Sequence, residues 1–172
     1  GIIERLNFYP PDELATIIQR AANVINIQIE TEATCLEVAR RSRGTPRIAN
    51  RLLKRIRDWA QIEADGIITV DVIQDALEAM GVDQLGLDEL DIKYLKTIIT
   101  KFNGGPVGVD TIAASLSEES DSIEDVIEPF MMQLGFIKRT PRGRVCCSAA
   151  YDHLNIEMPK ILETGNQQTQ LF

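Results

Sequence analysis

The sequence predicts a mainly α-helical protein with one two-stranded β-hairpin near its C-terminus. Apolar residues recur at intervals of three and four through four segments of the first half and three of the second, the spacing of amphipathic helices. A glycine-containing interruption at residues 81–87 separates the two halves. Two short strand-like runs flank a Pro-Arg-Gly turn at residues 141–143, and this pattern predicts the hairpin.

The composition is that of a folded globular protein. Its 172 residues are 44% apolar and 26% charged, and no apolar run approaches the roughly 20 residues that cross a bilayer. The first residues resemble neither a signal peptide nor a translation start, so we expect a cytoplasmic piece of a longer protein. Three cysteines without a C-x-x-C pair favour reduced thiols, and a single histidine excludes His-based metal clusters.

Residues 1–81 are expected to form a small bundle of four amphipathic helices. Prolines and acids at residues 10–13 suit the start of the first helix, where free N–H groups and the positive end of the helix dipole lie. Gly44 is expected to stop the second helix, and Pro46 to occupy the first turn of the third. The second, third and fourth helices are expected to begin after threonine N-caps, namely Thr31, Thr45 and Thr69.

Residues 82–156 follow a different pattern. We expect helices over residues 88–102, 109–116 and 120–134, then strands over residues 136–140 and 144–148. Three helices followed by a hairpin make the winged variant of the helix-turn-helix, in which the hairpin is the wing. The polar tail, residues 157–172, is expected to be disordered.

The net charge of −8 hides an uneven distribution of charges. Residues 40–57 contain eight basic residues and no acid, and residues 136–148 contain four basic residues and no acid. Local clusters of one sign create local fields whatever the total charge. The net charge therefore does not exclude a nucleic-acid partner.

The sequence contains no phosphate-binding G-x-x-x-x-G-K-[ST] loop and no Rossmann glycine turn, so we expect no catalytic residues in this chain. Arg47 is nevertheless notable, because it lies in the first turn of the expected third helix, where the dipole disfavours a cation. The position suits Arg47 if its side chain faces an anion, such as a nucleotide phosphate, that the helix N-terminus also attracts. The alternative is a solvated arginine on a basic helix face.

The basic residues of the second half gather on the hairpin; they are Lys138, Arg139, Arg142 and Arg144. The third helix of this half carries acids instead, including Glu124, Asp125 and Glu128, which phosphates would repel. If this half binds DNA, the wing makes the contact, mostly to phosphates and without regard to sequence. The alternatives are a basic hairpin without a partner and a protein-binding role for the acidic helix.

Four segments resemble the RuvB family, in the order that the family has them. Residues 44–53 (Gly-Thr-Pro-Arg-Ile-Ala-Asn-Arg-Leu-Leu) resemble its sensor-2 segment. Residues 102–108 (Phe-Asn-Gly-Gly-Pro-Val-Gly), 123–129 and 139–144 (Arg-Thr-Pro-Arg-Gly-Arg) resemble three further family segments. The resemblance covers nearly the whole chain, and it implies an AAA+ helical lid over residues 1–81 followed by a winged helix over residues 82–156.

What the resemblance implies for function is an ATP-dependent, homohexameric motor that migrates Holliday junctions in recombination and DNA repair, with RuvA and RuvC as partners. The P-loop, the Mg²⁺-binding acids and the arginine finger would belong to a domain outside this chain. ATP and Mg²⁺ would therefore be held mainly elsewhere. We expect this chain alone to be monomeric and not to hydrolyse ATP.

The resemblance also assigns residues. The expected nucleotide-binding residues are Tyr9, Pro46 and Arg47, of which Arg47 matches the sensor-2 arginine and Tyr9 a nucleotide-contacting tyrosine. Arg139 and Arg144 match DNA-contacting arginines of the wing, and Lys138 and Arg142 join them by their charge. Ser120 stands where the family often has a further DNA-contacting arginine, so we expect less DNA contact at the start of that helix.

Two other interpretations remain open. A winged-helix regulator or adaptor with a helical oligomerisation domain would prefer one DNA sequence by several kcal/mol, whereas a motor would not. Replication initiators and clamp loaders also attach domains to an AAA+ lid. The Arg-Thr-Pro-Arg-Gly-Arg hairpin and the Gly-Gly-Pro-Val-Gly turn favour the RuvB family over these.

Overall fold

A computed structural model describes residues 8–159, and the chain divides between Ile92 and Lys93 into two compact units. The first unit includes four helices, the segment that follows them and the first turn of the next helix, which continues into the second unit. No helix within residues 8–159 is long and apolar enough to cross a membrane. Most of the tail that we expected to be disordered lies outside the described residues.

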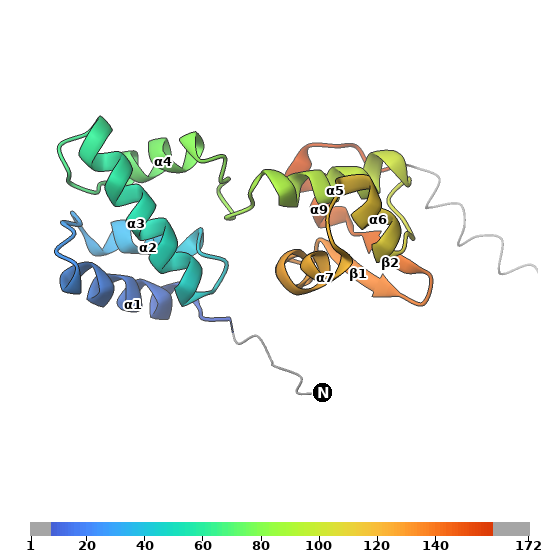
Figure 1. Ribbon diagram of the computed structural model, residues 1–172, viewed down its shortest axis with the longest axis horizontal. Helices are drawn as coiled ribbons and strands as arrows, with labels where there is room; N and C mark the ends of the chain where they lie inside the picture. The colour runs from blue at the N-terminus through green and yellow to red at the C-terminus, as the bar shows by residue number, and fades with distance from the viewer. Residues whose placement is uncertain (1–7, 160–172) are drawn as a thin grey trace, which may run out of the picture. The chain divides into compact units, whose positions relative to one another are not determined.

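The first unit is a bundle of four helices, which confirms the predicted fold class (Figure 1). The helices are α1 (Pro11–Val24), α2 (Glu32–Arg40), α3 (Pro46–Glu63) and α4 (Val70–Ala79). Their apolar faces share one core, whose fully buried side chains include Leu14, Ile18, Leu53, Ile56, Ile73 and Leu77. A bridge between Ile29 and Ile68 joins the connection between α1 and α2 to the connection between α3 and α4.

Two of the three predicted threonine caps form. Thr31 and Thr69 each accept the amide three residues later, at 3.4 and 3.2 Å. Thr45 occupies the N-cap position of α3, but its hydroxyl donates to the carbonyl oxygen of Arg43 at 3.2 Å instead. The first-turn amides of α3 therefore have no side-chain cap. The prediction that Gly44 stops the second helix is wrong, since α2 ends at Arg40.

The second unit contains most of α5 (Glu89–Lys101) and α6 (Val109–Leu116), followed by a helical segment that is not one α-helix. It consists of α7 (Ser120–Ser122), the π-helical η1 (Ile123–Ile127) and α8 (Glu128–Gln133). We attribute the π-helical turn to Pro129, which has no N–H to donate and whose ring needs space beside the preceding turn. The sequence predicted one uninterrupted helix here.

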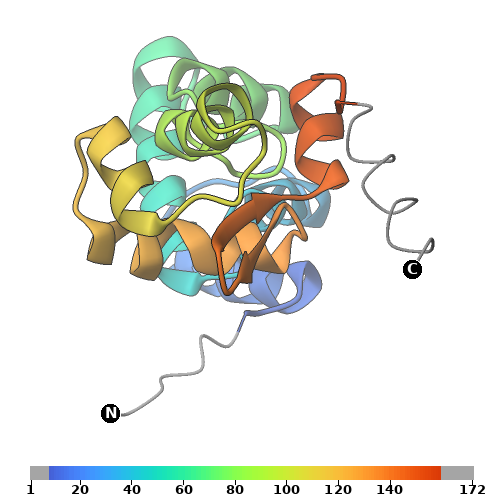
Figure 2. The ribbon, with the colours of Figure 1, turned by 90° about the vertical axis from the view of Figure 1, so that its right-hand side faces the viewer.

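The wing consists of β1 (Ile137–Thr140) and β2 (Gly143–Cys146), which pair antiparallel (Figure 2). Val107 forms a further bridge to Arg144, so a third segment adjoins β2. The strand predicted to continue to Ser148 ends at Cys146, because Ser148 begins a helix, α9 (Ser148–Leu154). This helix was not predicted, and it covers the unit with the buried side chains of Ala150 and Tyr151.

Candidate functional site

The predicted nucleotide-binding residues lie at one edge of the first unit. The amide of Tyr9 donates to the carbonyl oxygen of Gly44 at 2.8 Å, which holds the chain before α1 against the loop before α3. Gly44 has φ +69°, and a Cβ there would lie 3.0 Å from the side chain of Phe8, so glycine suits the position. Tyr9 is 41% exposed, and it is held beside the segment that carries Pro46 and Arg47.

Arg47 is exposed at the start of α3 and forms no hydrogen bond or ion pair with any other residue that the structure describes. The N–H groups around it are uncapped, because Thr45 bonds elsewhere. Pro46, at the first helical position, has no N–H and sets the backbone for the helix. A cation above an uncapped helix start is an arrangement that binds a phosphate well.

The predicted DNA-binding residues Arg139 and Arg144 are directly opposite each other across the hairpin. Like charges in such a pair repel each other, so the pair needs an anion. Glu128 supplies it. Its Oε2 accepts from Arg144 Nε at 2.9 Å, and its Oε1 accepts from Arg139 Nη2 at 3.1 Å. The Glu128 side chain is 0% exposed, so this anion is entirely inside the protein.

Two more side chains complete the network around Glu128. The hydroxyl of Tyr94, on α5, donates to Glu128 Oε2 at 2.5 Å, and Glu124 Oε1 lies 3.3 Å from Arg144 Nη2. A buried carboxylate is costly unless it is paired and hydrogen-bonded, and here it is both. The network therefore joins the hairpin to α5 and to the start of α8.

The network also fixes the protonation states of its members. Burial tends to raise the pKa of Glu128, but hydrogen bonds from Arg144 and Tyr94 and the charges of both arginines hold it below its usual value. Burial and the neighbouring Glu128 raise the pKa of Tyr94. Its hydrogen bond to Glu128 raises the pKa of Arg144. At neutral pH the carboxylate is therefore ionised, the phenol is neutral and the guanidinium is charged.

The outward surface of the wing is carried by other residues. Lys138 and Arg142 are exposed, and their side chains have no partner within residues 8–159. Arg139 is 46% exposed even though it contacts Glu128. Arg144 is only 14% exposed and its guanidinium contacts Glu128, so in this structure it presents less charge to solvent than the other three basic residues of the hairpin, and its DNA contact stays a prediction.

The acidic helix differs from the expectation at Glu128, which is buried and does not belong to the exposed face of the helix. Asp121 and Asp125 are exposed as expected. Ser120 donates to Asp110 Oδ1 at 2.6 Å, so it extends an acidic surface and adds no positive charge. The start of this helix is therefore poorly suited to DNA phosphates.

Sequence reasoning missed the burial of Glu128 and its contact with Tyr94. One available signal was the alternation of the strand: Ile137 is apolar, so Arg139, two residues later, lies on the same inward face. A second signal was the position of Glu128 three residues before the buried Met131, on the apolar face of its helix. Together these place a carboxylate opposite inward arginines.

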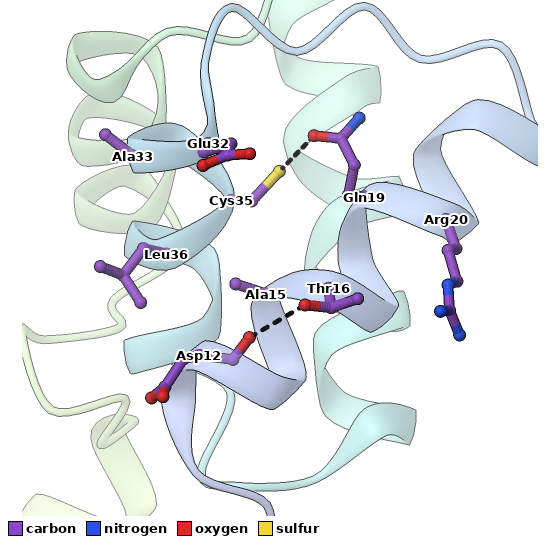
Figure 3. Close-up of a pocket in the computed structure, with 9 residues that line it drawn as sticks. All are labelled: Asp12, Ala15, Thr16, Gln19, Arg20, Glu32, Ala33, Cys35 and Leu36. Atoms are coloured by element: carbon purple, nitrogen blue, oxygen red, sulfur yellow. Dashed lines mark hydrogen bonds between the residues drawn. The ribbon is translucent and has the colours of Figure 1, made fainter.

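A cavity of 580 Å³ lies elsewhere in the first unit, between α1 and α2 (Figure 3). In it, Cys35 Sγ lies 3.2 Å from Gln19 Oε1. Burial raises the pKa of Cys35, which keeps the thiol protonated and unreactive. Tyr9, Pro46 and Arg47 do not line this cavity, so it is separate from the edge that carries the predicted nucleotide-binding residues.

Comparison with known proteins gives two family matches in tandem. Residues 9–83 match the RuvB AAA lid domain, and residues 84–155 match the RuvB C-terminal winged helix domain. Among solved structures, the RuvB Holliday junction branch migration motor of Thermotoga maritima is 48% identical over 90% of this chain, with a TM-score of 0.84. A lysine-to-arginine variant of that protein is 48% identical over 92% of this chain, with a TM-score of 0.86. This chain covers 51% and 53% of those two chains, about half of their length.

Proposed function

Because this chain belongs to the RuvB family, we propose that it is the nucleotide-sensing and DNA-contacting part of an ATP-dependent motor that migrates Holliday junctions during recombination and DNA repair. The observation that carries the proposal is the division of charge on the wing. Glu128 neutralises the inner arginines, whereas Lys138, Arg142 and the exposed part of Arg139 remain outside.

These outward cations suit a DNA backbone. They lie on a short hairpin that can approach one groove or strand, and phosphate contacts of this kind bind DNA of any sequence. A motor that moves along DNA requires such indifference to sequence. The acidic surface around Asp121 and Asp125 would face away from phosphates.

The second part of the proposal concerns the lid, which would contact the nucleotide. ATP and Mg²⁺ would be held mainly by an ATPase domain outside these residues, with Arg47 and the uncapped start of α3 reaching the phosphates from the lid. A change of nucleotide would then move the lid and, through it, the wing. In the intact motor we propose a homohexamer acting with RuvA and RuvC, and a monomer for this chain alone.

The experiment that tests the proposal joins this chain to the ATPase domain of the T. maritima relative and measures ATP-driven migration of a four-way junction. The Lys138→Ala/Arg142→Ala variant should lose migration, and the matched Lys96→Ala variant, at an exposed position of α5, should not. Migration that survives the wing substitutions would show that the wing does not grip DNA. Strong preference for one DNA sequence would favour a regulator instead.

A further inference from the structure

The loop between α2 and α3, residues 41–45, contacts two functional parts of the first unit at once. On one side, Gly44 accepts the amide of Tyr9 at the nucleotide-facing edge. On the other side, Arg43 Nη1 donates to Asp91 Oδ2 at 2.8 Å. The side chains of Arg43 and Asp91 are only 10% and 1% exposed, so this ion pair is inside the protein.

Asp91 also belongs to the start of α5. Its Oδ2 accepts the amide of Asp88 at 2.9 Å, and Asp88 Oδ1 accepts the amide of Asp91 at 2.9 Å. This reciprocal pair is a capping box, which fixes the first turn of a helix. One carboxylate oxygen thus accepts both the helix-start amide and the guanidinium, so α5 begins at a point tied to the 41–45 loop.

The segment between α4 and α5 is a compact turn that packs on the 41–45 loop. Asp83 Oδ1 accepts the amides of Leu85 and Leu87, both at 2.9 Å, and this folds the segment into a compact turn. Gly86, with φ +86°, packs so closely on the loop that a Cβ would lie 2.6 Å from the carbonyl oxygen of Arg41. Leu87 is fully buried. The turn that precedes α5 is therefore packed directly on the 41–45 loop.

We propose that the Arg43–Asp91 ion pair is the link through which the nucleotide-facing edge of the lid moves helix α5, the first helix of the winged-helix part. The proposal rests on the function proposed above, in which Arg47 responds to nucleotide. Arg43 and Asp91 are positioning residues in this scheme, because neither touches nucleotide or DNA. Arg43 is four residues before Arg47 in the same loop-to-helix segment.

Burial distinguishes this pair from a surface ion pair on the neighbouring helix. The Arg40–Glu37 pair, on α2, has side chains that are 55% and 23% exposed. Water can replace such a surface contact at little cost, whereas a buried pair holds its geometry because separation leaves an unpaired charge inside the protein. A buried pair can therefore carry displacement, and Arg40→Ala supplies the matched control.

Hydrogen exchange in this chain tests the link directly. Asp91→Asn keeps an oxygen for the Asp88 amide but removes the charge that holds Arg43. We expect exchange to rise about tenfold at the amide of Ile92 in α5, and also at the distant amides of Tyr9 and Thr45, which are bonded to Gly44 and Ser42. Arg43→Lys, which keeps the charge, should give a smaller rise, and Arg40→Ala should give none.

Two results would overturn the link. A rise confined to the start of α5 would show that the pair merely caps that helix. A uniform rise that includes core amides of α4 would show that the pair only stabilises the unit. With the ATPase domain joined, Asp91→Asn should retain ATP turnover and lower the junction migration per ATP. An absence of migration in the unsubstituted protein would refute the proposed function, while the exchange result would still decide the link.

Discussion

Arg144 contacts Glu128 at two points, from Nε to Oε2 at 2.9 Å and from Nη2 to Oε1 at 3.0 Å. This paired geometry uses both oxygens of the carboxylate and both donors on one edge of the guanidinium, which makes it strong and directional. It joins β2 of the wing to the first residue of α8. The shape of the wing thus depends on a buried anion, whereas its outward charge depends on other residues.

Glu128→Gln should destabilise the winged helix strongly. The substitution removes the charge that offsets Arg139 and Arg144 and leaves Arg144, 14% exposed, without its main partner. Breaking a buried pair costs about 3 to 5 kcal/mol of unfolding free energy. Urea unfolding measures it, with Glu124→Gln as the control, since Glu124 is 40% exposed and should cost less than about 1 kcal/mol. Equal effects of the two substitutions would contradict the central place given to Glu128.

Tyr94→Phe should lower the unfolding free energy by about 1 to 3 kcal/mol, because Glu128 loses the donor at its Oε2. The chain offers a matched control in Tyr151→Phe. The Tyr151 hydroxyl is also buried but has no hydrogen-bond partner within residues 8–159, so its removal should cost much less. Thermal unfolding of the two variants decides the point. A larger loss for the Tyr151 variant would remove Tyr94 from the network.

The stability that Glu128 contributes should persist through mildly acidic pH. Its pKa in the folded protein lies below the ordinary 4.5. A carboxyl group with a lowered pKa stabilises the fold above its unfolded pKa and loses that effect as pH falls through the folded pKa. The difference in unfolding free energy between the wild type and Glu128→Gln should stay constant from about pH 8 to pH 5.5 and shrink below about pH 4.5. A difference that already declines between pH 7 and 6 would contradict the pKa direction.

Arg47→Ala should lower ATP turnover at least tenfold, on the order of 1.4 kcal/mol, in a protein that joins this chain to the ATPase domain. Lid folding should be unaffected, because Arg47 is exposed and has no partner among the described residues. Arg51→Ala, an exposed arginine one turn further along α3, is the control and should leave turnover within about twofold. Unchanged turnover in the Arg47 variant would refute its role as a nucleotide sensor.

Local signals predicted most of the fold. The helix starts at residues 10–13 and the caps at Thr31 and Thr69 follow from free N–H groups and nearby acceptors, which sequence spacing reveals. The absence of a side-chain cap at Thr45 could not be predicted in the same way, because its hydroxyl donates to a carbonyl oxygen that the fold of the loop brings close. Helix α9 was hidden for a related reason: its seven residues are too short for periodicity to show.

The sequence predicted the residue types of the candidate site, but not which of their side chains face solvent and which face the protein interior. The basic hairpin and Arg47 were visible as charges in the sequence. The inward direction of Arg144 depends on Glu128, 16 residues earlier, and on Tyr94, which comes from another helix. Such contacts between distant segments set which charge faces solvent, and no local pattern records them.

The most direct test of the account is binding of this chain to duplex and four-way-junction DNA over a range of salt concentrations, with Lys138→Ala/Arg142→Ala beside the wild type and Lys96→Ala as control. We expect weak binding of any sequence, with affinity falling as salt rises. The double variant should lower the slope of log affinity against log salt by about two, and the control should match the wild type. Binding that keeps its affinity and slope in the double variant, or that strongly prefers one sequence, would contradict a wing that grips the DNA backbone.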